Sequence, residues 1–302
     1  MEQLTLALDW TPNINHIGFF IAQQKKFYRE LDLKVTIIDP SSDNYAITPA
    51  KKVELGIANF ALCPTESIFS YRTKSKPFDL TAIAAILQYD LSAIAVIKDG
   101  KIKSPKDLDG KTYASYNARY EDAIVKQMIQ NDGGKGEITT NYPEKLGIWE
   151  TVVKNGFDAT WIFLNWEGVE AISKKIPIQY FKMRDYNIPY AYSPVIAASQ
   201  TLAKTKAAAY RKFLEATKKG YMFCKNYPNE AVAILKRYIP ESDKSIDLRM
   251  SLNTSIDAFG TENTWGKMNR EQVKTFLNWL YSQNLESKRL TVDELMTNVL
   301  IP

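Results

Sequence analysis

Strand-like and helical segments alternate through about residue 200, and helical segments alone follow to the end of the chain. The first unit is a strand over 4–9, a helix over 18–31 and a second strand over 34–39. Apolar residues near a period of 3.6 predict the helix, and short β-branched runs predict the strands. This alternation is typical of an α/β fold with parallel sheets.

The predicted strands fall into two blocks, and the chain passes between the blocks twice. It enters the second block at 87–92 and leaves it at 189–194. A chain of 302 residues is long enough to bury two cores. We therefore expect one lobe from residues 1–90 together with 193–302, a second lobe from residues 91–192, and a ligand cleft between them. A further helix is predicted over 147–154.

Charge and cysteine content disfavour several classes of function. The 39 basic and 34 acidic residues are scattered and leave a net charge of +5, whereas a nucleic-acid surface favours a basic stripe interleaved with aromatic residues. Two cysteines, Cys63 and Cys224, and one histidine, His16, make neither a disulfide scaffold nor a metal site. We expect no nucleic acid, no metal and, since no apolar run approaches about 18 residues, no membrane span.

The start of the chain has no charged region, apolar segment and cleavage site of the secretory type. The protein is therefore either cytoplasmic, or a mature periplasmic form to which Met1 was added. The sequence leaves both compartments open.

The first predicted strand ends in Asp9 and Trp10, and a turn rich in proline and asparagine follows. Side chains at the carboxyl ends of parallel strands face the crevice where α/β proteins bind ligands. Trp10 offers a flat apolar face and Asp9 an acceptor for amino groups, although Trp10 packed into the lobe interface is the structural alternative. Asn13 and His16 are further candidate contacts, with capping of the next helix as the alternative for His16.

A strand meets a helix at "LCPTES", residues 62–67. Backbone N–H groups and hydroxyls at such a junction can hold a polar or anionic group, and Glu66 can accept from amino groups. Ordinary helix capping is the alternative. The candidates here are Pro64, Thr65, Glu66 and Ser67.

The stretch "SYNARYED", residues 115–122, forms the equivalent junction in the second block. Arg119 would meet a phosphate through its side chain; a surface pair of Arg119 with Glu121 or Asp122 is the alternative. The candidates here are Tyr116, Asn117, Arg119 and Tyr120.

Two later stretches complete the predicted cleft. "WIFLNWEGVE", residues 161–170, brings Asn165, Trp166 and Glu167 to the start of a helix, where a carboxylate is favourable in any case. In "PYAYSP", Tyr190 and Tyr192 are expected to close over the ligand on the side opposite Trp10, with hinge packing as the alternative.

Four stretches, over 8–28, 51–67, 104–116 and 161–171, resemble the substrate-binding proteins related to thiamine-pyrimidine synthesis and uptake. That family includes binding proteins for aminopyrimidines and the fungal hydroxymethylpyrimidine phosphate synthase. The resemblance implies a periplasmic-binding-protein fold of type II and an aminopyrimidine or similar heteroaromatic ligand. It leaves open whether an ABC transporter permease is a partner. It also implies that Glu167 contacts the ring nitrogen and the exocyclic amine, because a carboxylate accepts two parallel bonds.

The fungal enzyme binds pyridoxal phosphate through a lysine, has a histidine four residues on, and carries a cysteine cluster elsewhere. The stretch that matches the lysine and histidine, 56–69, contains neither, and the stretch that matches the cluster, 190–199, contains no cysteine. A Schiff base cannot form without an amine. We therefore expect a binding protein with no catalytic residue and no cofactor, and the synthase-like enzyme is the alternative.

Overall fold

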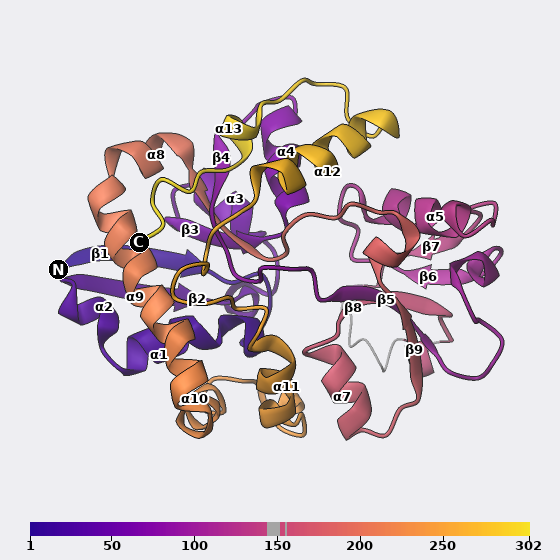
Figure 1. The fold of residues 1–302 in the computed structure, drawn as a ribbon, viewed down its shortest axis with the longest axis horizontal. Coiled ribbons are helices and arrows are strands. Elements are labelled where there is room, and N and C mark those ends of the chain that lie inside the picture. Colours follow the sequence, from indigo (N-terminus) through magenta and orange to yellow (C-terminus); the bar gives the residue numbers. More distant parts are fainter. Residues whose placement is uncertain (144–151, 155) are drawn as a thin grey trace.

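The computed structural model describes residues 1–143, 152–154 and 156–302 and places two five-stranded sheets in separate lobes. Both termini lie in the first lobe (Figure 1). The first sheet has the order β2-β1-β3-β10-β4 and the second β7-β6-β8-β5-β9. The predicted two-lobed α/β fold is confirmed. The strands are β1 (Glu2–Ala7), β2 (Leu33–Ile38), β3 (Phe60–Cys63), β4 (Leu80–Ala85), β5 (Ser92–Ile97), β6 (Thr112–Ala114), β7 (Thr139–Asn141), β8 (Ala159–Phe163), β9 (Ile178–Phe181) and β10 (Val195–Ser199).

Most of the described helices cover the first sheet, as Figure 1 shows. None of them is long and apolar enough to cross a bilayer, as far as the described residues go. The first lobe contains α1 (Ile17–Gln24), α2 (Phe27–Glu30), α3 (Pro49–Glu54), α4 (Thr65–Thr73), α8 (Gln200–Thr205), α9 (Ala207–Asn226), α10 (Pro228–Leu235), α11 (Leu248–Ser255), α12 (Arg270–Ser282) and α13 (Val292–Leu295). The second contains α5 (Glu121–Asn131) and α7 (Glu167–Ser173).

The chain crosses between the lobes over 86–91, after β4, and over 182–194, before β10. The predicted lobe boundaries, after residues 90 and 192, fall within these two segments, and we keep that division as a proposal. The sheets are mixed, so the expectation of parallel sheets was wrong. The strands that follow the crossings, β5 and β10, run antiparallel to both of their neighbours. Each enters its sheet from the edge that faces the other lobe, without the helical crossover that makes a strand parallel.

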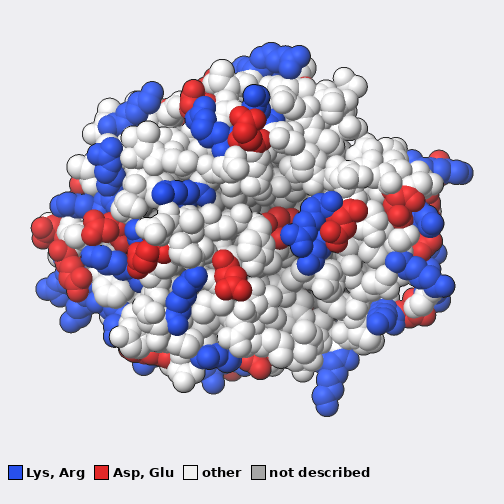
Figure 2. All heavy atoms as spheres, in the orientation of Figure 1, with Lys and Arg blue, Asp and Glu red and all other residues white. Residues whose placement is uncertain are grey.

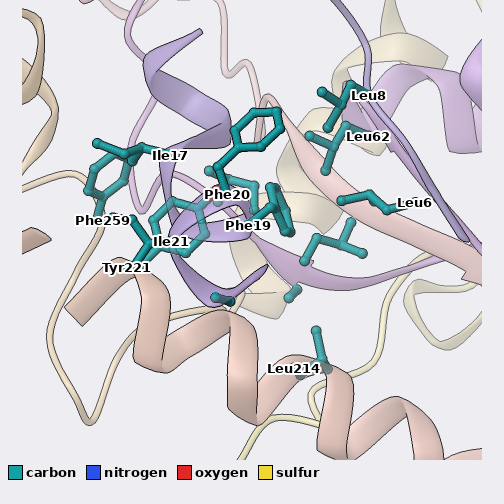
Figure 3. Close-up of a cluster of buried hydrophobic side chains, with 14 of the residues drawn as sticks. Leu6, Leu8, Ile17, Phe19, Phe20, Ile21, Leu62, Leu214, Tyr221 and Phe259 are labelled. Atoms are coloured by element: carbon teal, nitrogen blue, oxygen red, sulfur yellow. The ribbon is translucent and has the colours of Figure 1, made fainter. Parts of the chain in front are cut away.

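Successive residues of a strand point to opposite faces of a sheet. In the first sheet, the two faces carry side chains of different size. On one face, Leu6 and Leu62 pack with Phe19 of α1 and with α9 below it (Figure 3). On the other face, Ala61 and Cys63 pack with α3, α4 and α12. The small residues allow α3 and α4 to approach the sheet closely, beside the edge at which β3 ends.

Helices α1 and α9 cross in close contact at two glycines. A Cβ atom on Gly220 would lie 2.0 Å from the carbonyl oxygen of Gly18, and one on Gly18 would lie 2.2 Å from the ring of Tyr221. Only residues without a side chain fit such a crossing. The hydroxyl of Tyr221 then donates to the carbonyl oxygen of Asn15, so this crossing holds the turn that precedes α1.

One predicted helix is broken in the structure, and another lies mostly outside the described residues. The helix expected over 18–31 is broken into α1 and α2, because Lys26 adopts a left-handed conformation with φ of 66°. The break turns Tyr28 toward α9, where its hydroxyl bonds to Thr217 at 2.9 Å. The helix expected over 147–154 lies mostly outside the described residues.

Candidate functional site

A cavity of about 470 Å³ lies between the two lobes. Its wall in the first lobe comes from the turn after β1, the start of α3 and the β3–α4 junction, and its wall in the second lobe comes from the junctions before α5 and α7. Pockets for small ligands have volumes of about 300–1,000 Å³. The cavity therefore has the size of a small-molecule site.

The structure brings most of the predicted site residues to this wall. From the first lobe these are Asp9, Trp10, Asn13, Pro64, Glu66 and Ser67. From the second lobe and the return segment they are Tyr116, Arg119, Trp166, Glu167 and Tyr190.

The other predicted residues do not line the cavity, because the protein engages them elsewhere. These are His16, Thr65, Asn117, Tyr120, Asn165 and Tyr192. Thr65 donates from its N–H and its hydroxyl to the carbonyl oxygen of Tyr192, at 3.0 and 2.6 Å, which ties the return segment to α4. The hydroxyl of Tyr192 accepts the N–H of Asn269 at 2.7 Å. Asn117 is exposed in a left-handed turn, with φ of 61°.

His16 supports Asp9. The buried ring accepts the N–H of Asn13 at Nδ1 (3.2 Å), so its proton is on Nε2, which donates to Asp9 Oδ1 at 2.7 Å. The side chain of Asn13 accepts the N–H of Asn15. Asp9 is thus oriented from behind by His16, a candidate ligand contact that instead lies outside the cavity wall.

Trp10 lies at the junction of the two lobes. Its ring centroid is 6.0 Å from that of Tyr116, nearly perpendicular to it, and 5.6 Å from that of Tyr45. Tyr190, which was expected opposite Trp10, packs against Trp161 at 5.3 Å and Phe276 at 5.2 Å. The ring from the second lobe that meets Trp10 is therefore Tyr116.

Glu167 is the first residue of α7 and is 8% exposed. Its Oε2 atom accepts the N–H of Phe163 at 2.8 Å. Burial raises the pKa of its carboxyl to about 8. At neutral pH this carboxyl holds its proton much of the time, so it can both donate and accept at the cavity wall.

Glu66 and Glu121 face the same cavity from opposite lobes. Burial, followed by the negative charge of Glu121, raises the pKa of Glu66 to about 8. From the sequence, Glu121 is expected only as a surface partner of Arg119. In the structure, its carboxylate instead accepts hydrogen bonds from the hydroxyl of Tyr113 and from the backbone N–H groups of Tyr116 and Ala118.

Arg119 reaches across to the first lobe, so the alternative of a surface pair with Glu121 or Asp122 is wrong. Its guanidinium lies 3.0 Å from Glu286 and donates to the hydroxyl of Thr73 at 2.6 Å. The hydroxyl of Tyr120 donates to the same Glu286 carboxylate at 3.0 Å. This cluster joins the lobes on one side of the cleft.

Asn165 joins the lobes at a second place. Its amide donates to Asn15 Oδ1 at 2.7 Å and to Ser255 Oγ at 2.9 Å. Ser251 donates to its backbone carbonyl. Asn165 is fully buried, so it holds α7 against α11 and the turn before α1.

Sequence reasoning missed part of the wall. Ser70 and Tyr71 lie one turn beyond Glu66 and Ser67, and helical spacing from that pair would have found them. Trp161 and Phe163 share one face of β8, which period-two spacing would also have found. The residues at the start of α3, Thr48–Ala50, carry no comparable signal in the sequence.

Known proteins resemble the chain along its whole length. It is 21% identical to the formylaminopyrimidine-binding protein of Halalkalibacterium halodurans, over 99% of this chain and 91% of that protein. It is 22% identical to the 4-amino-5-hydroxymethyl-2-methylpyrimidine phosphate synthase of Legionella pneumophila, over 89% of this chain and 85% of that protein.

The fold also matches solved structures. The periplasmic aliphatic sulphonate-binding protein SsuA of Escherichia coli superposes with a TM-score of 0.71 at 15% identity, over 97% of each chain. The two lobes thus have the fold of periplasmic binding proteins. The NMT1/THI5-like family model matches residues 13–231. The chain belongs to the NMT1/THI5-like family.

Proposed function

We propose that the protein is a solute-binding protein that encloses an aminopyrimidine, or a similar flat amino-bearing heteroaromatic molecule, between its two lobes and does not transform it. The observation that carries this proposal is Glu167, a buried carboxyl on the wall of a cavity that also contains the indole of Trp10. The carboxyl can form hydrogen bonds with the edge of a ring, and the indole can stack on its face.

The edge chemistry fits a 4-aminopyrimidine. Such a ring presents an exocyclic amine, which donates, beside a ring nitrogen, which accepts or carries a proton. A carboxyl that shares one proton with the ring nitrogen makes two parallel bonds to this edge, and the pair is charge-assisted when the proton lies on the ring. The raised pKa of Glu167 places the carboxyl in the range where this sharing takes place near neutral pH.

The faces of the ring would meet aromatic side chains. Trp10 and Tyr116 lie on either side of the lobe junction, and Trp161 and Phe163 line the wall in the second lobe. Stacking of a base on an aromatic side chain contributes about 1–3 kcal/mol. The contacts between the lobes at Arg119 and Asn165 would then close the cleft over the ligand.

The cavity supports binding rather than the synthase reaction. None of its described lining residues is a lysine or a histidine, so this wall does not fit a Schiff base with pyridoxal phosphate. Burial raises the pKa of the Cys63 thiol, which leaves it a poor nucleophile. We keep an ABC transporter permease as the proposed partner, since periplasmic binding proteins share this fold.

The test is a thermal-shift and calorimetric titration with 4-amino-5-hydroxymethyl-2-methylpyrimidine and its N-formylaminomethyl analogue. At 100 times its Kd, a ligand adds about 2.7 kcal/mol to the free energy of unfolding, so we expect a rise of several degrees in Tm. 5-Hydroxymethyl-2-methylpyrimidine, which lacks only the amine, is the matched control and should give little shift.

Equal responses to the control and to the aminopyrimidines would contradict the proposal, and so would no response to any of them. Incubation with pyridoxal phosphate tests the alternative. An imine absorbance would support the synthase-like enzyme and count against a purely binding role.

A further inference from the structure

Two glutamates bring carboxyl groups to one cavity from opposite lobes. Glu66 lies in the first turn of α4 and Glu121 is the first residue of α5. Both line the cavity, and they are 5% and 3% exposed. Buried carboxyls are normally paired or hydrogen-bonded, so the partners of each decide what it does.

The carboxylate of Glu121 is satisfied by its own lobe. It accepts the hydroxyl of Tyr113 at 2.8 Å, the N–H of Tyr116 at 3.1 and 3.0 Å and the N–H of Ala118 at 3.3 Å. Donors of this kind favour the charged form. Burial nevertheless raises the pKa of Glu121 above its usual value, and these donors oppose that rise. The Glu121 carboxyl thus faces the cavity already supplied with hydrogen bonds by its own lobe.

Within the described residues, the Oε2 atom of Glu66 has no such support. This atom is fully buried, and no described atom of the protein donates a hydrogen bond to it. Leaving a buried acceptor without a partner is unfavourable. Its pKa of about 8 reflects this burial and the facing charge of Glu121, so in the ligand-free protein Glu66 holds a proton at neutral pH.

The remaining charged groups on the wall do not neutralise this pair. Asp9 and Glu167 are further acidic residues of the cavity wall, and Arg119 forms an ion pair with Glu286. The other ionisable groups that face the cavity are the Cys63 thiol and the phenols of Tyr71, Tyr116 and Tyr190. Within the described parts of the chain, no three acidic, cysteine or histidine side chains are arranged to hold a metal ion. The complement to this wall is therefore an organic cation.

We propose that Glu66 and Glu121 form a second recognition subsite that binds a protonated amine, so that the ligand is an aminopyrimidine with a cationic aminoalkyl arm. This inference rests on the proposed function, because the ring must first lie against Glu167. When the ammonium group binds, the Glu66 carboxyl releases its proton to solvent and the ammonium donates to the resulting carboxylate. The cation then lies between two carboxylates, one from each lobe.

The experiment compares two ligands that differ in one group: 4-amino-5-aminomethyl-2-methylpyrimidine and its 5-hydroxymethyl counterpart. Both compounds present the same edge to Glu167, so any difference in affinity comes from the substituent at position 5. We expect the aminomethyl compound to bind about ten- to a hundredfold more tightly at pH 7, as a charged hydrogen bond would give. Calorimetry in buffers of different ionisation enthalpy should show close to one more proton released with the aminomethyl compound.

The variant Glu66→Gln should lose both the preference for the amine and the extra proton release. Glu54→Gln, on α3 and paired with Lys51 and Lys74 outside the cavity wall, is the matched control and should keep both. Thermal unfolding of each variant establishes that it is folded.

Two outcomes would overturn the inference, and they are distinguishable. Equal affinity and equal proton release for both ligands would remove the cation subsite and leave the proposed function standing. Failure of both ligands to bind the parent protein would remove the proposed function and the subsite with it.

Discussion

Glu66 and Glu121 are the same type of residue, in similar positions, with different surroundings. Each follows a strand at the start of a helix and is almost fully buried at the cleft. The second lobe supplies donors from Tyr113, Tyr116 and Ala118 to Glu121, whereas no described protein atom donates to Glu66 Oε2. Burial alone therefore does not show whether the protein itself satisfies a carboxyl at the cleft or leaves it for a ligand. The number of donors that the protein provides does.

The largest effect should come from Glu121→Ala. It leaves the Tyr113 hydroxyl and the N–H groups of Tyr116 and Ala118 without their acceptor, and these groups are buried or partly buried. We expect the free energy of unfolding to fall by about 3–5 kcal/mol, as measured by urea denaturation. A loss below about 1 kcal/mol would mean that Glu121 is not held structurally, and the contrast with Glu66 would disappear.

Glu66→Gln should act in the opposite direction and depend on pH. The pKa of Glu66 is about 8 in the folded protein, well above its usual value. Folding therefore takes up a proton between pH 4.5 and 8. The contribution of Glu66 to stability then falls by about 1.4 kcal/mol per pH unit across this window.

Glutamine does not titrate, so the variant should be the more stable protein at pH 8, by about 2–4 kcal/mol, with a difference that shrinks toward pH 5. Urea denaturation of both proteins at pH 5, 6.5 and 8 measures it. Glu167 gives the parent a similar slope, but it is present in both proteins and cancels. A difference that stays constant with pH would place Glu66 among the structurally paired carboxyls.

Glu167 should fall between these two extremes, because the N–H of Phe163 donates to its carboxyl while burial still raises its pKa to about 8. We expect Glu167→Gln to weaken aminopyrimidine binding by about 1.5–3 kcal/mol through loss of a charge-assisted bond. Isothermal titration calorimetry measures the affinity. If the affinity is unchanged, Glu167 does not form hydrogen bonds with the ring, and another acid of the cavity wall must do so.

Trp10→Ala should produce the smallest of these effects, a loss of about 1–3 kcal/mol in affinity. Stacking does not involve a titrating group, so this loss should be the same at pH 6 and pH 8, unlike the effects at the carboxyls. Calorimetry at the two pH values checks it. A loss that varies with pH would mean that Trp10 acts by placing Asp9, its neighbour in the chain.

The sequence predicted the two lobes because the spacing of its apolar residues indicates alternating strands and helices, in two blocks joined by two crossings. It did not predict the direction of β5 and β10, since strand direction depends on where the chain enters each sheet. A strand that arrives from the other lobe looks the same in sequence as one that follows a helix of its own.

For the site, the sequence indicated Asp9, Trp10 and Glu167 at the cleft because strand ends in α/β folds meet along one edge. It could not separate a residue on the wall from one directly behind it. His16 and Asn165 have the polarity of ligand contacts, but they bind Asp9 and Asn15 instead. Such partners lie far away in sequence or depend on the exact turn geometry.

The most direct measurement is a crystal structure of the protein with 4-amino-5-hydroxymethyl-2-methylpyrimidine. We predict that the ring lies between the lobes against Trp10, with its amine and adjacent ring nitrogen within about 3.2 Å of the Glu167 carboxyl. A ligand bound outside this cavity, or inside it but turned away from Glu167, would contradict the account.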